Sequence, residues 1–145
     1  MPESPTDTRA DYVHWLAIPT RWMDNDAYGH VNNVTYYSYF DTVVNKHLIA
    51  AGVLDVDHDE VFGVVVETGC RFLDALSFPE TVDAGVRVAR IGTTSVRYEI
   101  GLFHQGIDAP AAVGHFVHVY VDRATRRPAP VPPAHRIVLE PLVRV

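Results

Sequence analysis

The sequence predicts an α+β domain in which an antiparallel sheet wraps one long helix. Two patterns predict it. Residues 34–51 contain no glycine or proline and carry apolar side chains at steps of three or four, which is helical spacing. Four segments between residues 61 and 121 are rich in apolar residues, and two of them alternate apolar and polar side chains as half-buried strands do.

The chain has the size and composition of one folded domain. It contains 145 residues, of which 48% are hydrophobic, so it forms a core and is not intrinsically disordered. No repeat or linker divides it. We therefore expect one domain over residues 10–145, preceded by a flexible tail at residues 1–9.

The helix has start and stop signals. Asn32 or Asn33 caps its beginning, and Gly52 ends it. Its apolar stripe consists of Tyr37, Phe40, Val44, Leu48 and Ala51. At 1.5 Å per residue its 18 residues span about 27 Å.

The strands are expected at residues 12–21, 61–72, 82–88, 94–102 and 113–121. Short separators between the later segments favour antiparallel hairpins. The proline-rich residues 128–133 are expected to be neither helix nor central strand.

Composition excludes several classes of function. A net charge of −6 argues against nucleic-acid binding, and no apolar run is long enough to span a membrane. The single cysteine, Cys70, cannot form an internal disulfide. The first residues do not resemble a signal peptide, so a soluble cytoplasmic protein is expected. We expect no metal site, since His115 and His118 would lie on opposite faces of a strand.

The segment before the helix carries the most chemistry. It places Asp24, Asp26 and His30 close to a helix N-terminus, whose first N–H groups have no intrahelical acceptor. Such N–H groups stabilise a carbonyl oxygen that becomes negative during attack, and a nearby carboxylate can act as nucleophile or general base. The arrangement suits acyl transfer. Asp and Asn are also common capping residues, so a purely structural role remains the alternative.

The same segment, Arg21-Trp-x-Asp-x-Asp-x-x-Gly-His-Val-Asn-Asn33, followed by an aromatic-rich helix, resembles the hotdog-fold acyl thioesterases, more narrowly the 4-hydroxybenzoyl-CoA thioesterase-like family. The resemblance runs from about residue 12 to about residue 142. It continues through Cys70-Arg-Phe-Leu73, Arg90-Ile-Gly-Thr-Thr-Ser95 and Val121-Asp-Arg-Ala-Thr-Arg-Arg-Pro128.

This resemblance implies roles for individual residues. Asp26 matches the catalytic carboxylate, the N–H near Asn33 matches the group that polarises the thioester carbonyl, and Gly29 allows a tight turn. The family builds each site across a dimer interface, which implies a homodimer or homotetramer. The partner's strand would then line the acyl pocket with Val66, Glu67, Thr68 and Gly69.

The resemblance also bears on the thiol carrier. Ser95 matches a position near the pantetheine or nucleotide of CoA, with Arg90 nearby. The basic cluster of the benzoyl-specific relatives is replaced here by Gly92-Thr93-Thr94. An acyl-carrier protein is therefore an alternative to acyl-CoA, and no cofactor is implied.

Several residues compete for the same roles. Asp24 is expected to bond backbone groups of the turn, and Asp41 is a second candidate acid because some relatives carry theirs on the helix. Glu67 lies among valines, where a buried carboxylate is possible. His30 either orients Asp26 or bonds the loop backbone. Cys70 is expected to be buried and inert.

Aromatic residues of the helix are expected mainly to pack, while one or two, among them Tyr36, wall an acyl channel. The sequence thus predicts a thioesterase that uses Asp26. The alternatives are a hotdog hydratase or dehydratase that uses a histidine with a nearby acid, and a non-catalytic module that binds acyl-CoA.

Overall fold

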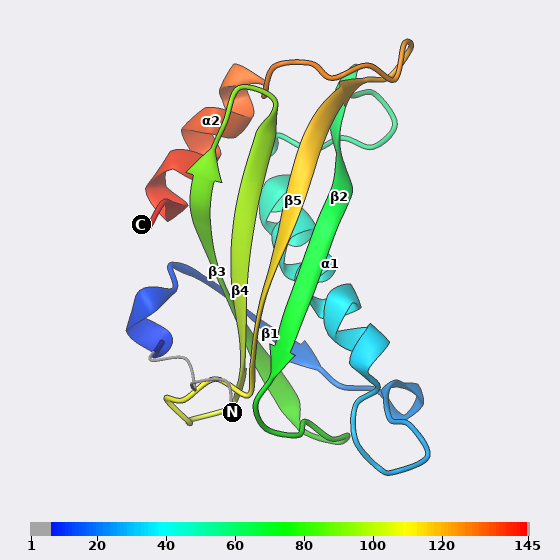
Figure 1. Ribbon diagram of the computed structural model, residues 1–145, viewed down its shortest axis with the longest axis vertical. Coiled ribbons are helices and arrows are strands. Elements are labelled where there is room, and N and C mark those ends of the chain that lie inside the picture. Colours follow the sequence, from blue (N-terminus) through cyan, green and yellow to red (C-terminus); the bar gives the residue numbers. More distant parts are fainter. Residues whose placement is uncertain (1–6, 145) are drawn as a thin grey trace.

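The computed structural model describes residues 7–144, which form a five-stranded antiparallel sheet with one long helix across one face (Figure 1). The strand order is β1-β3-β4-β5-β2. The strands are β1 (His14–Pro19), β2 (Val61–Phe72), β3 (Thr81–Ile91), β4 (Ser95–His104) and β5 (Ala112–Asp122); the helices are α1 (Asn33–Ala50) and α2 (Pro133–Leu139). The five expected strands and the long helix are confirmed.

Helix α1 begins and ends where its capping residues predict. The side chain of Asn32 accepts a hydrogen bond from the Val34 N–H, and Gly52, just past the helix, has a φ of +78°. The buried face is wider than the expected stripe, because Tyr36 and Val43 are as buried as Phe40. Ala51 is exposed and lies outside the helix.

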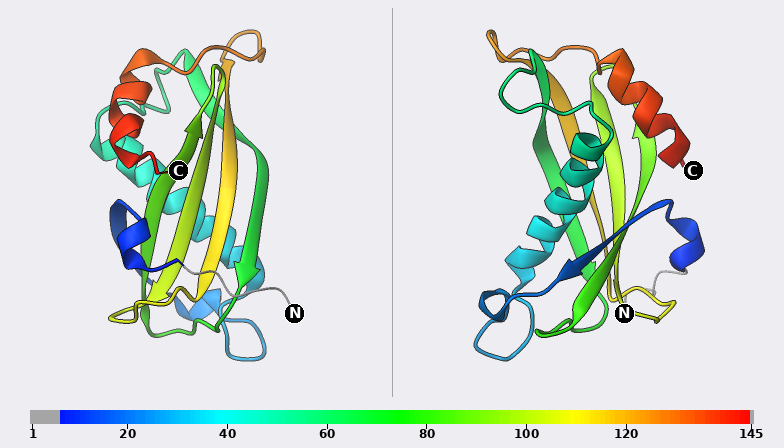
Figure 2. Two further views of the ribbon diagram at one scale, coloured as in Figure 1. Left: turned by 60° about the vertical axis from the view of Figure 1, so that its left-hand side comes forward. Right: turned by 180° about the vertical axis from the view of Figure 1, so that it is seen from behind.

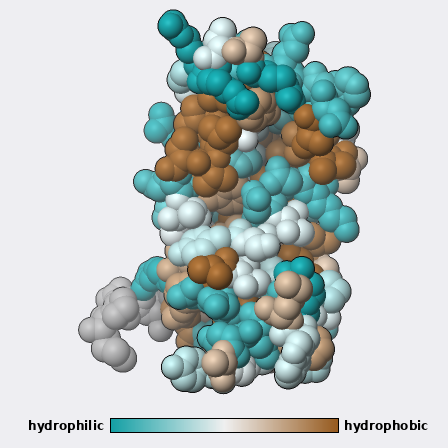
Figure 3. All heavy atoms as spheres, turned by 90° about the vertical axis from the view of Figure 1, so that its right-hand side faces the viewer, coloured by the Kyte–Doolittle hydropathy of each residue, from teal (hydrophilic) through white to brown (hydrophobic). Residues whose placement is uncertain are grey.

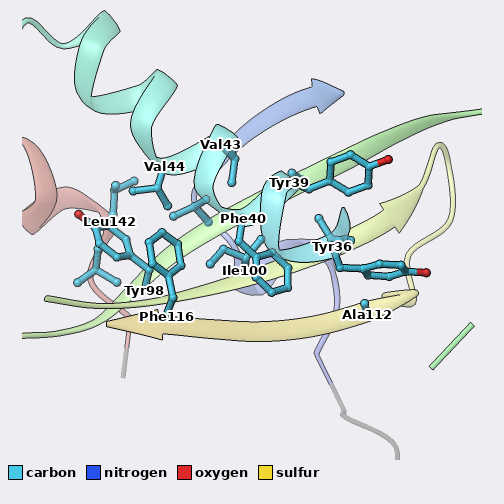
Figure 4. Packing of buried hydrophobic residues seen from close by; sticks show 14 of the residues in the cluster. Tyr36, Tyr39, Phe40, Val43, Val44, Tyr98, Ile100, Ala112, Phe116 and Leu142 are labelled. Atoms are coloured by element: carbon cyan, nitrogen blue, oxygen red, sulfur yellow. The ribbon is translucent and has the colours of Figure 1, made fainter. Parts of the chain in front are cut away.

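The core lies between α1 and the concave face of the sheet (Figures 2 and 4). Phe40, Val43 and Val44 of α1 meet Ile100 of β4 and Phe116 of β5, and all five are almost fully buried. Gly114 of β5 leaves the space that the Phe40 ring fills. Helix α1 is therefore fixed against the middle of the sheet, and the positions of its two ends follow from that packing.

The two edges of the sheet differ. On the β3 edge, β1 pairs with the first half of β3, and the C-terminal segment continues along the second half through a parallel bridge from Val143 to Val88. Strand β2 forms the other edge. Two adjacent residues of β2, Val65 and Val66, are 48% and 58% exposed. Figure 3 views this side of the molecule and shows apolar patches separated by polar residues. Edge strands of this length are commonly covered in native proteins.

The two ends of the chain are more ordered than the sequence predicts within the described residues. The prediction that residues 128–133 exclude helix is wrong at its last residue, because α2 begins at Pro133, a position where the missing N–H costs nothing. Most of the expected tail, residues 1–6, lies outside the described residues. Arg9 is held by hydrogen bonds to Asp83 and to the carbonyl oxygen of His104. Within residues 7–144 no helix is long and apolar enough to cross a membrane.

Candidate active site

The segment between β1 and α1 folds back on itself as a small closed loop. The Asn32 N–H donates to the Asp24 carbonyl at 2.8 Å, and the Asp26 N–H donates to the His30 carbonyl at 2.8 Å. Gly29 stands at the tip with a φ of +82°, a conformation that side chains disfavour. The two hydrogen bonds flank an isolated bridge between Asn25 and Val31, so Asp26 lies opposite His30 in the loop that precedes α1. The tight turn expected at Gly29 is thus present.

Asp26 has one engaged and one open carboxylate oxygen. Its Oδ1 accepts a hydrogen bond from the Tyr28 N–H at 2.8 Å. Its Oδ2 has no hydrogen-bond donor among residues 7–144, and the residue is half-buried. One oxygen therefore fixes the orientation of the carboxylate while the other is available to a substrate or a water molecule.

The first turn of α1 supplies a donor beside this loop. The Asn32 side chain accepts a hydrogen bond from the Val34 N–H at 3.2 Å, and the Asn32 backbone carbonyl accepts one from the Thr35 N–H. The Asn33 N–H has no acceptor within the described chain. It carries part of the positive end of the helix dipole, so it can stabilise negative charge on a carbonyl oxygen.

Asp24 is a structural residue, as expected. It is 1% exposed, and its Oδ2 accepts hydrogen bonds from the Arg21 N–H at 2.9 Å and from the Tyr39 hydroxyl at 2.8 Å. The Arg21 guanidinium binds Oδ1 at 2.9 Å. Burial alone would raise the pKa of Asp24, but these hydrogen bonds and the Arg21 charge outweigh it and lower the pKa. The carboxylate ties the loop to α1 and has no oxygen left for chemistry.

Arg21 and Tyr39 are therefore positioning residues that sequence reasoning missed. The three-residue spacing from Arg21 to Asp24 was a visible signal of an ion pair. The contact between Asp24 and Tyr39 joins residues fifteen apart and appears only once the loop is folded.

His30 and Tyr36 border one open cavity of about 330 Å³, together with Phe72, Leu73, Asp74 and Ala75. The ring of Tyr36 packs edge-on against that of Phe72, with the ring centroids 4.9 Å apart. The His30 imidazole forms no hydrogen bond with any residue from 7 to 144; only its backbone carbonyl holds Asp26. The cavity places the apolar side chains of Phe72 and Leu73 beside the loop.

The β2 residues expected in the acyl pocket lie on the open edge of the sheet. Val66 is the extra residue of a bulge, between Val65 and Glu67. Glu67 is not buried: its side chain is 60% exposed and contacts His115 at 3.1 Å. Thr68 donates to the His115 carbonyl, and Gly69 leaves room for the His115 ring. These residues are separated from Asp26 in the sequence by the whole of α1.

Arg90 and Ser95 lie at the turn between β3 and β4, which Figure 1 shows at the opposite end of the sheet from the loop before α1. Arg90 is exposed and forms no ion pair with a described residue. Ser95 packs against Gly92, whose N–H donates to the Ser95 carbonyl. One protomer does not bring these two residues to Asp26.

The structure also places the other candidate catalytic and metal-ligating residues. Asp41 is exposed on α1 and accepts a hydrogen bond from Asn45; it lines a second open cavity with Thr68. Burial raises the pKa of the Cys70 thiol to about 12, so it stays protonated at neutral pH. His115 and His118 point to opposite faces of β5, as expected. No group of metal-ligating side chains is present in residues 7–144.

Comparison with known proteins adds to this geometry. The model of the thioesterase-like superfamily matches residues 20–139. The chain belongs to this superfamily. The PA5185 protein of Pseudomonas aeruginosa strain PAO1 is 47% identical, with a TM-score of 0.93 and coverage of 96% of this chain and 97% of that one.

Two further structures extend the comparison. PA2801 of Pseudomonas aeruginosa, named as a candidate thioesterase, is 31% identical over 87% of this chain and 97% of its own, with a TM-score of 0.80. Slr0204 of Synechocystis, a 1,4-dihydroxy-2-naphthoyl-CoA thioesterase, shares the fold at 11% identity and a TM-score of 0.79, over 86% and 93%. A comparison with curated proteins found no significant match. The domain is thus a hotdog-fold thioester hydrolase.

Proposed function

We propose that this thioesterase hydrolyses an acyl-CoA to the free acid and CoA, with Asp26 as its catalytic carboxylate. The observation that carries the proposal is the pairing of an oriented carboxylate, open at Oδ2, with the unoccupied Asn33 N–H at the start of α1. A nucleophile or base and an oxyanion donor are the two groups that thioester hydrolysis requires.

The reaction follows from these two groups. The thioester oxygen accepts a hydrogen bond from the Asn33 N–H, which stabilises the negative charge that develops on attack. In one form Asp26 Oδ2 attacks the carbonyl carbon, the C–S bond breaks, the thiolate takes a proton from solvent, and water hydrolyses the resulting anhydride. In the other form Asp26 accepts a proton from water as that water attacks the carbonyl carbon; the C–S bond then breaks, and the thiolate takes up the proton held by Asp26. Both forms give one acid and one thiol.

We further propose that the working unit is a homodimer in which each site uses both protomers. Arg90 and Ser95, which we assign to the CoA moiety, lie at the opposite end of the sheet from Asp26. A two-fold axis at the open β2 edge would bring one protomer's Asp26 towards its partner's strands. Glu67, Thr68 and Gly69 lie on that edge, and exposed Val65 and Val66 offer apolar area for burial there.

Release of free thiol from a panel of CoA thioesters tests the activity. The panel runs from acetyl to palmitoyl and includes benzoyl and phenylacetyl groups; wild type is compared with Asp26→Asn and with Asp41→Asn. We expect turnover that collapses in Asp26→Asn and persists in Asp41→Asn. Tight binding without turnover of any ester would identify a binding module, and hydration of an enoyl-CoA without thiol release would identify a hydratase.

Complementation tests the shared site. Asp26→Asn and Arg90→Ala are each expected to be impaired, and co-expression of the two should restore about a quarter of the sites, because half of randomly formed dimers carry one intact site. Activity that stays at the average of the two variants would place the whole site within one protomer.

A further inference from the structure

Another cavity lies at the other end of α1. It has a volume of about 230 Å³ and is hereafter called the distal cavity. Its walls come from the last part of α1, the segment that follows it, the first residues of β2, the end of β5 and α2. They include Leu48, Leu54, Gly63, His118, Tyr120 and His135. Leu48 is fifteen residues from Asn33, which corresponds to about 22 Å along the helix. The distal cavity is thus separate from the loop that holds Asp26 in the same protomer.

Two imidazole rings in its wall each have a buried nitrogen without a hydrogen-bond partner in residues 7–144. His118, Tyr120 and His135 are 4%, 1% and 4% exposed. The Nδ1 atoms of both histidines are buried without a partner in residues 7–144, whereas the buried Tyr120 hydroxyl interacts with the Tyr98 hydroxyl. More than nine in ten buried polar groups in folded proteins are hydrogen-bonded, so two exceptions in one cavity wall require an explanation. A ligand that supplies the missing bonds is such an explanation.

The sequence makes room for His118 in this position. A Cβ at residue 63 would lie 2.9 Å from His118 Nδ1, so glycine there lets the imidazole lie against β2. Burial lowers the pKa of His118 to about 4, with the nearby His135 adding to the effect. The ring is therefore neutral at pH 7 and offers one donor and one acceptor.

The charged residue at the cavity is already engaged. Arg123 donates from Nε to the Asp59 carbonyl and from Nη2 to the Val56 carbonyl, and its guanidinium lies 5.2 Å from the Phe62 ring. These bonds hold the loop of residues 54–59 as a wall. Asn45 also lines the cavity, and its amide group donates to Asp41. Apart from the two histidines and Tyr120, the other lining side chains are apolar, and Leu48 and Leu54 are among them. A charged ligand would lose its hydration without gaining an opposite charge.

We propose that the distal cavity binds a small neutral molecule with a compact apolar body and one hydroxyl or carbonyl group. The polar group bonds to the His118 imidazole, and the apolar body packs against the two leucines. The volume fits a single substituted ring, since a cavity of about 150 Å³ in another protein holds benzene. This site does not depend on the proposed thioesterase mechanism.

Titration of the isotopically labelled full chain, followed by NMR, tests the proposal with phenol, toluene and benzoate as probes. We expect phenol to shift the signals of Gly63 and His118, and to bind about five- to tenfold more tightly than toluene because of its hydrogen bond. Benzoate should bind most weakly. No shift at these residues with millimolar phenol, or equal affinity for phenol and toluene, would overturn the proposal.

Variants locate the binding. His118→Phe removes the hydrogen bond but keeps a ring, and should weaken phenol about fivefold while toluene changes less than twofold. His115→Phe, on the opposite face of β5, is the matched control and should change neither. If His118→Phe does not fold, Leu54→Trp fills the cavity and should abolish binding of both probes. Phenol binding that survives Leu54→Trp, or a distal cavity that holds only water in the presence of phenol, would contradict the proposal.

Discussion

Removal of the Tyr39 hydroxyl tests how the candidate site is held in place. This hydroxyl donates to Asp24 Oδ2 at 2.8 Å, and the carboxylate is 1% exposed, so no solvent can replace the donor. A hydrogen bond to a buried charge contributes about 1.5–3 kcal/mol. Tyr39→Phe should therefore lower the free energy of unfolding by about 2 kcal/mol. For a domain of this size that corresponds to a fall in Tm of about 7 °C.

Urea unfolding of the variant measures this loss. Tyr37→Phe is the matched control, because Tyr37 lies on the same helix and its hydroxyl has no hydrogen bond with any described residue. The control should stay within about 0.5 kcal/mol of wild type. The difference between Tyr39→Phe and wild type should also shrink in acid. The pKa of Asp24 is lowered in the folded state, so its stabilisation is present above about pH 3.8 and is lost as the pH falls through the folded pKa.

The same variant should lower activity. The Asp24 carbonyl closes the loop through the Asn32 N–H, so loss of the Tyr39 bond loosens the frame that orients Asp26. Small misplacement of a catalytic group reduces kcat more than it changes KM. A Tyr39→Phe protein with wild-type stability and wild-type kcat would refute the reasoning.

Three other outcomes are expected. Burial alone would lower the pKa of His104, but hydrogen bonds to Glu80 and Asp74 outweigh it and raise the pKa. The stability that protonated His104 contributes should therefore be full below about pH 6.5 and lost as the pH rises through the folded pKa. Thermal unfolding across pH 5–9 should show this loss in wild type and not in His104→Gln. Cys70 should react slowly with iodoacetamide at pH 7, since burial raises its thiol pKa to about 12, and mass spectrometry would detect rapid labelling if this is wrong. Gly114→Ala should destabilise by about 1–3 kcal/mol in urea unfolding, because the new methyl group would overlap the Phe40 ring; a neutral effect would mean that the ring moves aside.

The regular elements could be predicted because local pattern determines them. The limits of β2 at residues 61 and 72 follow from its run of apolar residues between turn signals, and α1 follows from its spacing and from Asn32. Helix α2 was missed because it is short and begins at Pro133. Proline is favourable at the first position of a helix but unfavourable further along it, so the proline-rich segment argued against a helix.

Part of the candidate site could also be predicted from local sequence. The sequence places Asp26 and Asn33 near each other because Asp26 belongs to the short loop that ends where α1 begins, at Asn33. It could not distinguish the roles of Asp24 and Asp26, which depend on burial and on Tyr39, a partner fifteen positions after Asp24. The distal cavity was missed because His118 and His135 come from elements that meet only in the folded chain.

Comparison of kcat for wild type and Asp26→Asn, on the best thioester of the panel, tests the central claim most directly. Both proteins must first show the same unfolding midpoint. Loss of a general base or nucleophile is expected to lower kcat by a factor of about 10²–10⁴, while KM changes less. A kcat within tenfold of wild type would contradict the assignment of Asp26 and direct attention to Asp41.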